Sequence, residues 1–324
     1  MYSKEELTKT FEEYLSSLAF PGEPTSLYEP IIYSLGNGGK RLRPLLALMS
    51  CNLFCDDLSR ALPCAAAVEV FHNFTLLHDD IMDNAAVRRG KPAVHRKWGT
   101  NSAILSGDAM MIYSYRLLEG TSPEVLPEIF RIFNDTALKV CEGQQYDMDF
   151  ETLENVSMDE YMHMILLKTG VLLGGAAAIG AAVGGASAAD RDRLYTFGTE
   201  LGIAFQIRDD LLDSYGTEAS LGKVIGGDIL EGKKSFLTAA AMEAADDDTR
   251  MRLGGLMHNK EMLADTKISR VLAIYDSLDV RSRAERAILD HTAQATASLD
   301  GLSIPADRTA RLRAMAAGLA DRLK

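Results

Sequence analysis

The pattern of hydrophobic and polar positions predicts helices along most of the chain. Between Glu128 and Ile304 the sequence is rich in Ala, Leu, Met, Glu and Lys, and it lacks the alternating Val, Ile and Thr that is typical of strands. All nine prolines lie outside this interval, so none can break a helix within it. We therefore expect an all-α fold, a single large helical bundle of about ten to twelve helices with essentially no sheet.

Local signals mark some helix starts and some interruptions. Ser157–Glu160 has the form of a capping box, and Thr121–Glu124 places a proline near the first position of another helix. The segment Asn84–Thr100 is basic and rich in turn residues, and Leu221–Lys234 carries four glycines among charged residues. Gly170–Ala189 has no charge and consists mostly of Gly and Ala, so we expect a tightly packed internal helix there and not a membrane span.

Composition and charge narrow the class of protein. Of the 324 residues 47% are hydrophobic, which excludes disorder, and we expect one domain over residues 1–324. The chain has 34 Lys and Arg against 46 Asp and Glu, a net charge of −12 that repels nucleic acid phosphates. The first fifteen residues carry acidic charges where a signal peptide is apolar, and the four cysteines form no C-x-x-C pair. We expect a soluble cytoplasmic protein with buried thiols, no nucleic acid partner and no transmembrane segment.

Two acidic motifs of the form D-D-x-x-D carry the most specific chemical signal. They lie at Asp79–Asp83 and Asp209–Asp213, and each follows an apolar run. In a helix the first and last Asp of each motif share a face, and three carboxylates so close together repel one another. Mg²⁺ would relieve this repulsion, because it binds carboxylate and phosphate oxygens. Two solvated acidic helix ends are the alternative, but the repetition of the motif favours a magnesium site.

Basic residues accompany both acidic motifs, although the chain as a whole is acidic. The segment GGKRLRP at 38–44 places two glycines before a cationic helix start, where free N–H groups favour an anion. Arg88 and Arg89 follow the first motif, and Lys223, Lys233 and Lys234 lie near the second. Arginine offers bidentate contacts to phosphate and lysine a mobile point charge, so these cations predict diphosphate binding.

Together these motifs resemble those of the trans-prenyltransferases, or polyprenyl diphosphate synthases. The likeness extends over nearly the whole chain, through GGKRLRP, LLHDDIMDNAAVRRGKPAVH, KTG, FQIRDDLLD and GKVIGGDILEGKKS. It implies a bundle of the isoprenoid synthase type around a central cavity, with the two acidic motifs facing each other, and a homodimer. The implied reaction is the Mg²⁺-dependent condensation of isopentenyl diphosphate with an allylic diphosphate (dimethylallyl, geranyl or farnesyl).

The resemblance also implies roles for individual residues. It implies about three Mg²⁺ ions, with Asp79, Asp83 and Asp209 as ligands and Asp80, Asp210 and Asp213 in support, directly or through water. The implied ligands of the allylic diphosphate are Arg88, Lys168, Lys223 and Lys233, and those of isopentenyl diphosphate are Lys40, Arg43, His72 and Arg89. Thr169 and Gln206 would present oxygens to the developing allylic cation. Gly143, Gln144 and Asp147 match a further G-Q-x-x-D element that lines the cavity. The spacing agrees where it can be checked, because His72 and Gln206 fall on the helix faces of Asp79 and Asp209.

Bulk just before the first acidic motif sets product length in the family that the chain resembles. Phe74 is five residues before Asp79, about 7.5 Å along a helix, and the smaller Thr75 follows it. An aromatic at this position, with the two-residue spacer of DDIMD, resembles synthases that stop at twenty carbons. We therefore expect a product of fifteen to twenty carbons, favouring twenty. Phe74 as an ordinary core aromatic is compatible with this, because the floor of a cavity is also core.

Two other functions stay open at this point. Glu69–His72 and Glu160–His163 are both Glu-x-x-His, the pattern of di-iron carboxylate bundles, although Glu160 also completes the capping box. A catalytically weak subunit of a two-component synthase is the third possibility, but such subunits tend to lose the acidic motifs. If the chain is a synthase, the glycines of Leu221–Lys234 should let Lys223 and Lys233 close over bound diphosphate and exclude water.

Overall fold

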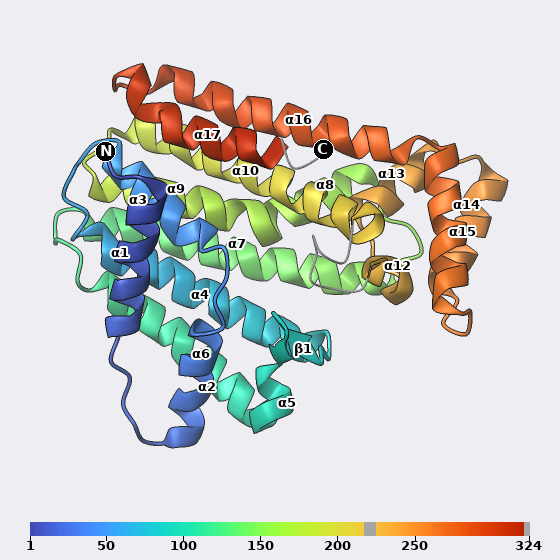
Figure 1. Cartoon of the computed structure of the whole chain (residues 1–324), viewed down its shortest axis with the longest axis horizontal. Coiled ribbons are helices and arrows are strands. Elements are labelled where there is room, and N and C mark those ends of the chain that lie inside the picture. The colour runs from blue at the N-terminus through green and yellow to red at the C-terminus, as the bar shows by residue number, and fades with distance from the viewer. Residues whose placement is uncertain (217–224, 321–324) are drawn as a thin grey trace. The chain divides into compact units, whose positions relative to one another are not determined.

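The computed structural model describes residues 1–216 and 225–320, which are almost entirely helical (Figure 1). The predicted all-α class is confirmed. These residues form more helices than the roughly ten to twelve expected, because the expected loops contain short ones such as α5 (Val94–Trp98) and α12 (Gly227–Glu231). The strands among the described residues are β1 (Val87–Arg88) and β2 (Lys91–Pro92), an antiparallel pair in which Val87 lies opposite Pro92.

The chain divides into two compact units, each built from three stretches of sequence. Unit 1 comprises Met1–Asn134, Gly175–Tyr195 and Leu302–Arg311, and unit 2 comprises Asp135–Gly174, Thr196–Gly301 and Leu312–Lys324. Four of the five boundaries fall inside helices, namely α7 (Leu126–Thr152), α9 (Val171–Val183), α10 (Ala188–Tyr215) and α17 (Ala310–Ala320). One domain over residues 1–324 stays a prediction.

Helix α4 is the central helix of unit 1, and it packs against α3 and α6. Its residues 64–71 are buried on every side, and four alanines in the helix allow the neighbouring helices to approach closely. The complete helices of this unit are α1 (Lys4–Ser17), α2 (Thr25–Leu35), α3 (Leu42–Asn52), α4 (Ala61–Met82), α5, α6 (Thr100–Leu118) and the 3₁₀-helix η3 (Ala306–Thr309).

The first acidic motif ends α4, and a local motif of the backbone explains why the helix stops there. Asn84 adopts a left-handed conformation with φ 52°, which asparagine tolerates better than most residues. The N–H of Ala85 donates to the carbonyl of Asp80 (2.9 Å) and that of Asn84 to the carbonyl of Ile81 (3.2 Å), the pattern of a Schellman cap. The chain then turns directly into the β1–β2 hairpin, which lies with α5 beside the end of α4 in Figure 1.

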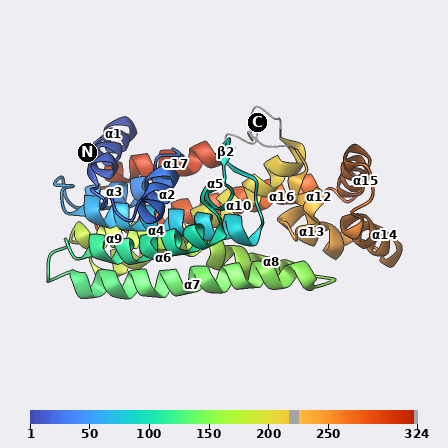
Figure 2. The same cartoon turned by 90° about the horizontal axis from the view of Figure 1, so that it is seen from below.

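Unit 2 contains the second acidic motif, in the last two turns of α10. Its other elements are α8 (Met158–Ile165), the π-helix η1 (Leu166–Gly170), α12, α13 (Phe236–Ala244), α14 (Asp247–His258), α15 (Ala264–Ser277), α16 (Val280–Ser298) and η2 (Leu299–Gly301), and α17 (Ala310–Ala320) lies mostly within it. Helices α14 and α15 pack against each other next to α12 and α13 (Figure 2). The capping box predicted at Ser157 and Glu160 is confirmed, because each side chain bonds the other residue's backbone N–H.

The apolar stretch around Gly170–Ala189 is buried. Residues Met158–Val183 are long and apolar enough to cross a membrane, but 89% of the apolar window is buried inside the protein. This agrees with the expected internal helix. The expectation of buried thiols holds for Cys51 and Cys64 and is wrong for Cys141, which is exposed on α7.

Candidate active site

The first acidic motif is bound to an arginine of the hairpin that follows it. Asp80 is buried, and its Oδ1 accepts hydrogen bonds from Nε (2.9 Å) and Nη2 (2.5 Å) of Arg88, whose Nη2 also lies 3.6 Å from Oδ2 of Asp79. Burial alone would lower the pKa of Arg88, but the hydrogen bond and charge of Asp80 raise it. Arg88 is therefore a fixed cation beside two carboxylates, while Asp83 is exposed at the end of the helix.

The four predicted isopentenyl diphosphate ligands lie on or near the turn before α3. Nη1 of Arg43 lies 3.1 Å from Nε2 of His72, and Nη1 of Arg89 donates to the carbonyl of Gly38. The Arg89 guanidinium lies so close to Gly39 that a Cβ there would come within 2.8 Å of its Cζ, so Gly39 leaves room for it. Lys40 is exposed on the same turn.

His72 is a neutral imidazole in this setting. Burial lowers its pKa well below 6.5, and the positive charges of Arg43, Arg89, Arg88 and Arg41 lower it further. The ring therefore accepts a hydrogen bond from Arg43 at neutral pH and adds no charge of its own.

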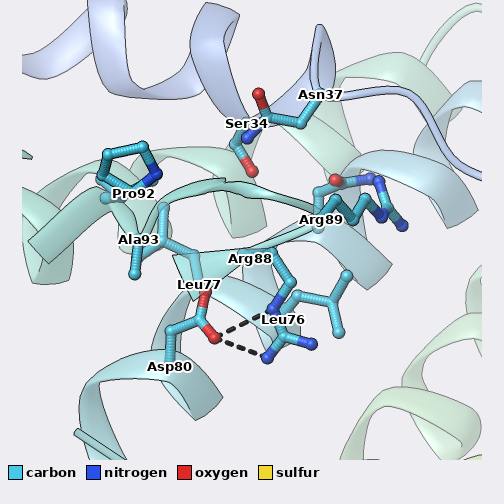
Figure 3. A pocket seen from close by; sticks show the side chains of 11 residues that line it. Ser34, Asn37, Leu76, Leu77, Asp80, Arg88, Arg89, Pro92 and Ala93 are labelled. Atoms are coloured by element: carbon cyan, nitrogen blue, oxygen red, sulfur yellow. Dashed lines mark hydrogen bonds and ion pairs between the residues drawn. The ribbon is translucent and has the colours of Figure 1, made fainter. Parts of the chain in front are cut away.

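A small pocket in unit 1 lies under the β1–β2 hairpin. Figure 3 shows Arg88 beside Asp80, joined to it by two hydrogen bonds, while Arg89 extends away from this pair. Ser34 and Asn37, from the end of α2 and the turn after it, line the opposite wall. The pocket thus brings together two arginines, a carboxylate and neutral polar groups around a space no larger than about one water molecule.

The second acidic motif divides its three carboxylates between two environments. Both oxygens of Asp210 are engaged, since Oδ2 accepts from the Tyr161 hydroxyl and the Phe236 N–H (2.8 Å) and Oδ1 from Nε2 of Gln206 (3.0 Å). Burial raises the pKa of Asp210 to about 6, although these hydrogen bonds oppose the rise. The Asp209 side chain is 45% exposed. Asp209 thus reaches solvent, with Nη2 of Arg208 3.9 Å from its Oδ1, whereas Asp210 bonds to groups inside the protein.

Asp213 is likewise turned toward the protein. Its Oδ2 accepts the N–H of Asp228 (3.0 Å), at the start of α12, and its backbone carbonyl accepts that of Gly226 (2.7 Å). Burial raises the pKa of Asp228 to about 8, and the charges of Asp210 and Asp213 contribute. Asp213 of the second motif therefore holds the start of α12, the helix that precedes Lys233.

Lys168 and Thr169 are neighbours in unit 2 that bond to different partners. The Thr169 hydroxyl donates to Oε1 of Gln206 (3.0 Å), and Lys168 makes an ion pair with Asp147. Lys168 and Thr169 belong to the π-helix η1, a distortion that is frequent at functional sites. Gly143 makes this possible, because a Cβ there would lie 2.3 Å from the backbone nitrogen of Lys168. The G-Q-x-x-D element thus has a physical role, since Gly143 admits the π-helix and Asp147 holds Lys168.

The remaining lysines and the chain-length residues occupy separate places. Lys233 lies 3.3 Å from Oε2 of Glu231. Lys223, and with it part of the expected closing segment, lies outside the described residues. The ring of Phe74 is buried on α4 between those of His78 (4.8 Å between centroids) and Phe71 (5.4 Å), and the hydroxyl of Thr75 donates to the carbonyl of His72 (2.8 Å).

The di-iron alternative has no support in the structure. Glu69 accepts hydrogen bonds from Nη1 of Arg41 (2.7 Å) and Nδ2 of Asn73 (3.1 Å), and Glu160 caps α8. Within residues 1–216 and 225–320, no group of three His, Cys, Asp or Glu side chains is arranged to hold a metal by itself.

The outermost carboxylates of the two motifs are of the kind that fits Mg²⁺. This ion keeps several waters and binds one or two protein carboxylates together with substrate phosphates, so it needs no preformed cage. Asp79 and Asp83 share a face at the end of α4, and Asp209 is partly exposed on α10. These hard oxygen donors are the kind that magnesium prefers.

Two residues that hold parts of the candidate site in place were not predicted from the sequence. They are Tyr161, beside the second acidic motif, and Arg41, in the turn before α3. Tyr161 is 1% exposed and binds Asp210 from 49 residues away, a contact that no local pattern reports. The one available signal was a tyrosine on an apolar helix face, which needs a partner for its hydroxyl when buried.

The chain is similar to known proteins over most of its length. The sequence model of the polyprenyl synthetase family matches residues 24–275. A geranylgeranyl diphosphate synthase of Methanosarcina mazei is 43% identical over 222 residues, which cover 68% of each chain. A solved geranylgeranyl pyrophosphate synthase has a TM-score of 0.95 at 41% identity over 99% of each chain. The corresponding enzyme of Corynebacterium glutamicum, solved with isoprenyl diphosphate and magnesium, has a TM-score of 0.86 at 27% identity over 98% of each chain.

Proposed function

The chain belongs to the polyprenyl synthetase family and is a prenyltransferase, and on this premise we propose that it makes a short-chain all-trans prenyl diphosphate. It condenses isopentenyl diphosphate head to tail with an allylic diphosphate, dimethylallyl, geranyl or farnesyl. The observation that carries this proposal is the end of α4, where two acidic side chains share Arg88 and a third, Asp83, stays exposed.

The two diphosphates are bound by different residues. Arg88, Lys168, Lys223 and Lys233 hold the allylic diphosphate, and Lys40, Arg43, His72 and Arg89 hold isopentenyl diphosphate. Asp79, Asp83 and Asp209 bind magnesium ions, about three in number. Once bound, Mg²⁺ supplies positive charge that offsets the charge on the leaving diphosphate. Asp80, Asp210 and Asp213 act through the hydrogen bonds described above, which fix Arg88, Gln206 and α12.

The reaction breaks one C–O bond and forms one C–C bond. The allylic C–O bond ionises, and its electron pair leaves with the diphosphate. The oxygens of Thr169 and Gln206, 3.0 Å apart, stabilise the positive charge on the allylic carbon. Gln206 keeps this orientation because its amide nitrogen donates to Asp210. The double bond of isopentenyl diphosphate then attacks C1, and a proton leaves to the freed diphosphate to restore an alkene.

The product has fifteen to twenty carbons, and we favour twenty. Phe74 blocks the chain about one and a half helical turns from Asp79, and its packing against Phe71 and His78 holds the ring in place. The relatives named geranylgeranyl synthases support this length.

The enzyme works as a cytoplasmic homodimer without a nucleic acid partner. Helix α6 supports the dimer, because Ile104, Leu105, Met111 and Ile112 are exposed and share one face of it. An apolar stripe of this kind suits a second copy of the same surface. The net charge of −12 and the burial of the apolar segment support a soluble enzyme.

Steady-state assays of Asp79→Ala and Asp209→Ala test the metal assignment. Each variant should keep less than about a tenth of wild-type turnover, because each removes an interaction needed in the transition state. Exposed Asp247→Ala on α14 is the matched control and should keep wild-type turnover. A variant of Asp79 or Asp209 that keeps more than this fraction contradicts the assignment, and no turnover by the wild-type chain alone would favour the weak-subunit alternative.

A further inference from the structure

Arg41 lies in the middle of the cationic segment 38–44 but differs from its neighbours. Lys40 is exposed and Arg43 is partly exposed, whereas Arg41 is 5% exposed. A side chain so deeply buried is not available to a ligand in the way that Lys40 is. Its role must lie in what it contacts inside unit 1.

The guanidinium of Arg41 makes three separate bonds to three different helices. Nε donates to Glu12 on α1 (2.8 Å), Nη1 donates to Glu69 on α4 (2.7 Å), and Nη2 donates to the carbonyl of Leu35 at the end of α2 (2.7 Å). Arg41 is itself the residue before α3. One side chain therefore connects the start of α3 to α1, α2 and α4.

These bonds satisfy the charge of Arg41 within the protein. Glu69 is 2% exposed in its side chain and Glu12 is 42% exposed, so two carboxylates face one guanidinium. A cation paired in this way has little charge left for a diphosphate.

The backbone around Arg41 adopts a conformation that the surroundings have to hold. Arg41 has φ 45° and ψ 34°, Gly38 has φ 71° and Gly39 has φ 136°. A non-glycine residue rarely adopts the left-handed region, and it persists there only where other contacts fix it. The three bonds of the guanidinium provide such contacts.

The shape of this turn decides where the nearby cations lie. The carbonyl of Gly38 accepts from Arg89, and the open side of Gly39 receives the Arg89 guanidinium. Arg43 reaches His72 from the first turn of α3, which directly follows Arg41. A change in the turn would therefore move Arg43 and Arg89 relative to His72.

We propose that Arg41 is a positioning residue for the isopentenyl diphosphate end of the site. It fixes the left-handed turn at 38–41 and so sets the spacing of Lys40, Arg43 and Arg89. This inference rests on the proposed function, because it takes those cations as the ligands of isopentenyl diphosphate. A lysine cannot replace Arg41, since one ammonium group cannot reach three acceptors that lie in the directions of the guanidinium fork.

The test measures the two substrates separately in Arg41→Lys and Arg41→Met. Both variants should raise the KM for isopentenyl diphosphate about tenfold or more, because small misplacements of binding groups have large effects. The KM for the allylic diphosphate should stay within about twofold of wild type. Titration calorimetry with isopentenyl diphosphate alone should show the same loss of affinity. Glu12→Gln, which removes the charge of one partner and leaves Glu69 and the carbonyl of Leu35 in place, should raise the same KM by a smaller factor. This milder variant keeps the proposal testable if the Arg41 variants misfold.

Two further variants distinguish a positioning role of Arg41 from a purely structural one and test the assignment of the isopentenyl diphosphate ligands. Arg191 also bonds a carbonyl, of Ala186 (2.9 Å), and a carboxylate, of Glu128 (3.3 Å), within unit 1 but away from the turn. Arg191→Met should therefore lower the melting temperature and leave both KM values unchanged. Arg43→Ala tests the ligand assignment itself, and an unchanged KM for isopentenyl diphosphate in this variant would contradict the proposed function. If Arg43→Ala raises that KM while the Arg41 variants and Glu12→Gln change both substrates equally or neither, Arg41 is not a positioning residue.

Discussion

The imidazole of His72 shows how one residue's surroundings decide its chemistry. Burial, with the charges of four arginines, holds its pKa well below 6.5, so the folded protein keeps it neutral where the unfolded chain would protonate it. Below pH 6.5 the unfolded state therefore binds a proton that the native state does not, and stability falls as the pH falls from 6.5 toward the lower native pKa. Above 6.5 this contribution is fully present.

This linkage gives a prediction for the variant His72→Gln, which has no group that titrates in this range. Its melting temperature should fall less than that of wild type between about pH 7.5 and 5.5. Differential scanning calorimetry at several pH values measures both slopes. If the melting temperatures of the two proteins changed equally with pH, the pKa of His72 would not be lowered in the folded protein. His258→Gln is the control, since His258 is exposed on α14, and its slope should match wild type.

Phe74 is the residue that we expect to limit product length. Phe74→Ala should remove the floor and shift the products to chains longer than those of wild type, while turnover continues. Leu77→Ala, a buried residue on the same helix, is the matched control for a cavity in α4 and should leave product length unchanged. Unchanged products from Phe74→Ala would show that another residue is the stop.

At the scale of the elements, the crossing of α7 with the π-helix depends on Gly143. A Cβ there would lie 2.3 Å from the nitrogen of Lys168 and 2.7 Å from the carbonyl carbon of Leu167, and backbone atoms cannot move aside as a flexible side chain does. Gly143→Ala should therefore destabilise the protein by about 1–3 kcal/mol and lower turnover, since it separates Lys168 from Asp147.

A second glycine gives the control for this prediction. Gly255 lies in α14, and a Cβ there would meet nothing within 4 Å. Gly255→Ala should stabilise the protein by up to about 1 kcal/mol, because alanine is the better helix former. Thermal melts and turnover of both variants check the pair, and a neutral Gly143→Ala would contradict the packing argument.

The elements that the sequence predicted are those with local causes. The capping box of Ser157 needs only residues three apart, and the helical run from 128 onward needs only composition, so both followed from the sequence. The hairpin β1–β2 was not predicted, because each strand is only two residues long and the segment has the composition of a basic loop. The sequence placed Pro123 near the first position of a helix, but α7 starts at Leu126, three residues later, because a turn precedes the helix.

The candidate site was predicted where motifs are contiguous and missed where contacts are distant. Both acidic motifs and the arginines of the hairpin were visible as short patterns. The bond from Tyr161 to Asp210 and the bonds of Arg41 to Glu12 and Glu69 join residues that are 28 to 49 positions apart. Asp210 and Arg41 are buried, whereas their sequence neighbours Asp209 and Lys40 are partly or fully exposed. The sequence alone does not show which residue of such a pair is buried.

At the scale of the whole molecule, the exposed stripe of α6 predicts self-association. Leu105 is 60% and Ile112 59% exposed on one face of the helix, where Ile104 and Met111 are also exposed, and it is this grouping of apolar side chains that points to an interface. Leu105→Glu with Ile112→Glu should convert a dimer into monomers in analytical ultracentrifugation, because charge would be buried at the interface. Leu263→Glu is the control, since this residue is 78% exposed at the start of α15 in unit 2, and it should leave the mass unchanged. A wild-type monomer would contradict the dimer.

The most direct test of the central claim is product analysis by mass. The purified chain is incubated with isopentenyl diphosphate and, in turn, with dimethylallyl, geranyl and farnesyl diphosphate, with Mg²⁺ and with the chelator EDTA. We expect a prenyl diphosphate of fifteen to twenty carbons, mainly twenty, that forms with Mg²⁺ and not with EDTA. No prenyl product with any starter, or chains beyond twenty-five carbons, would contradict it.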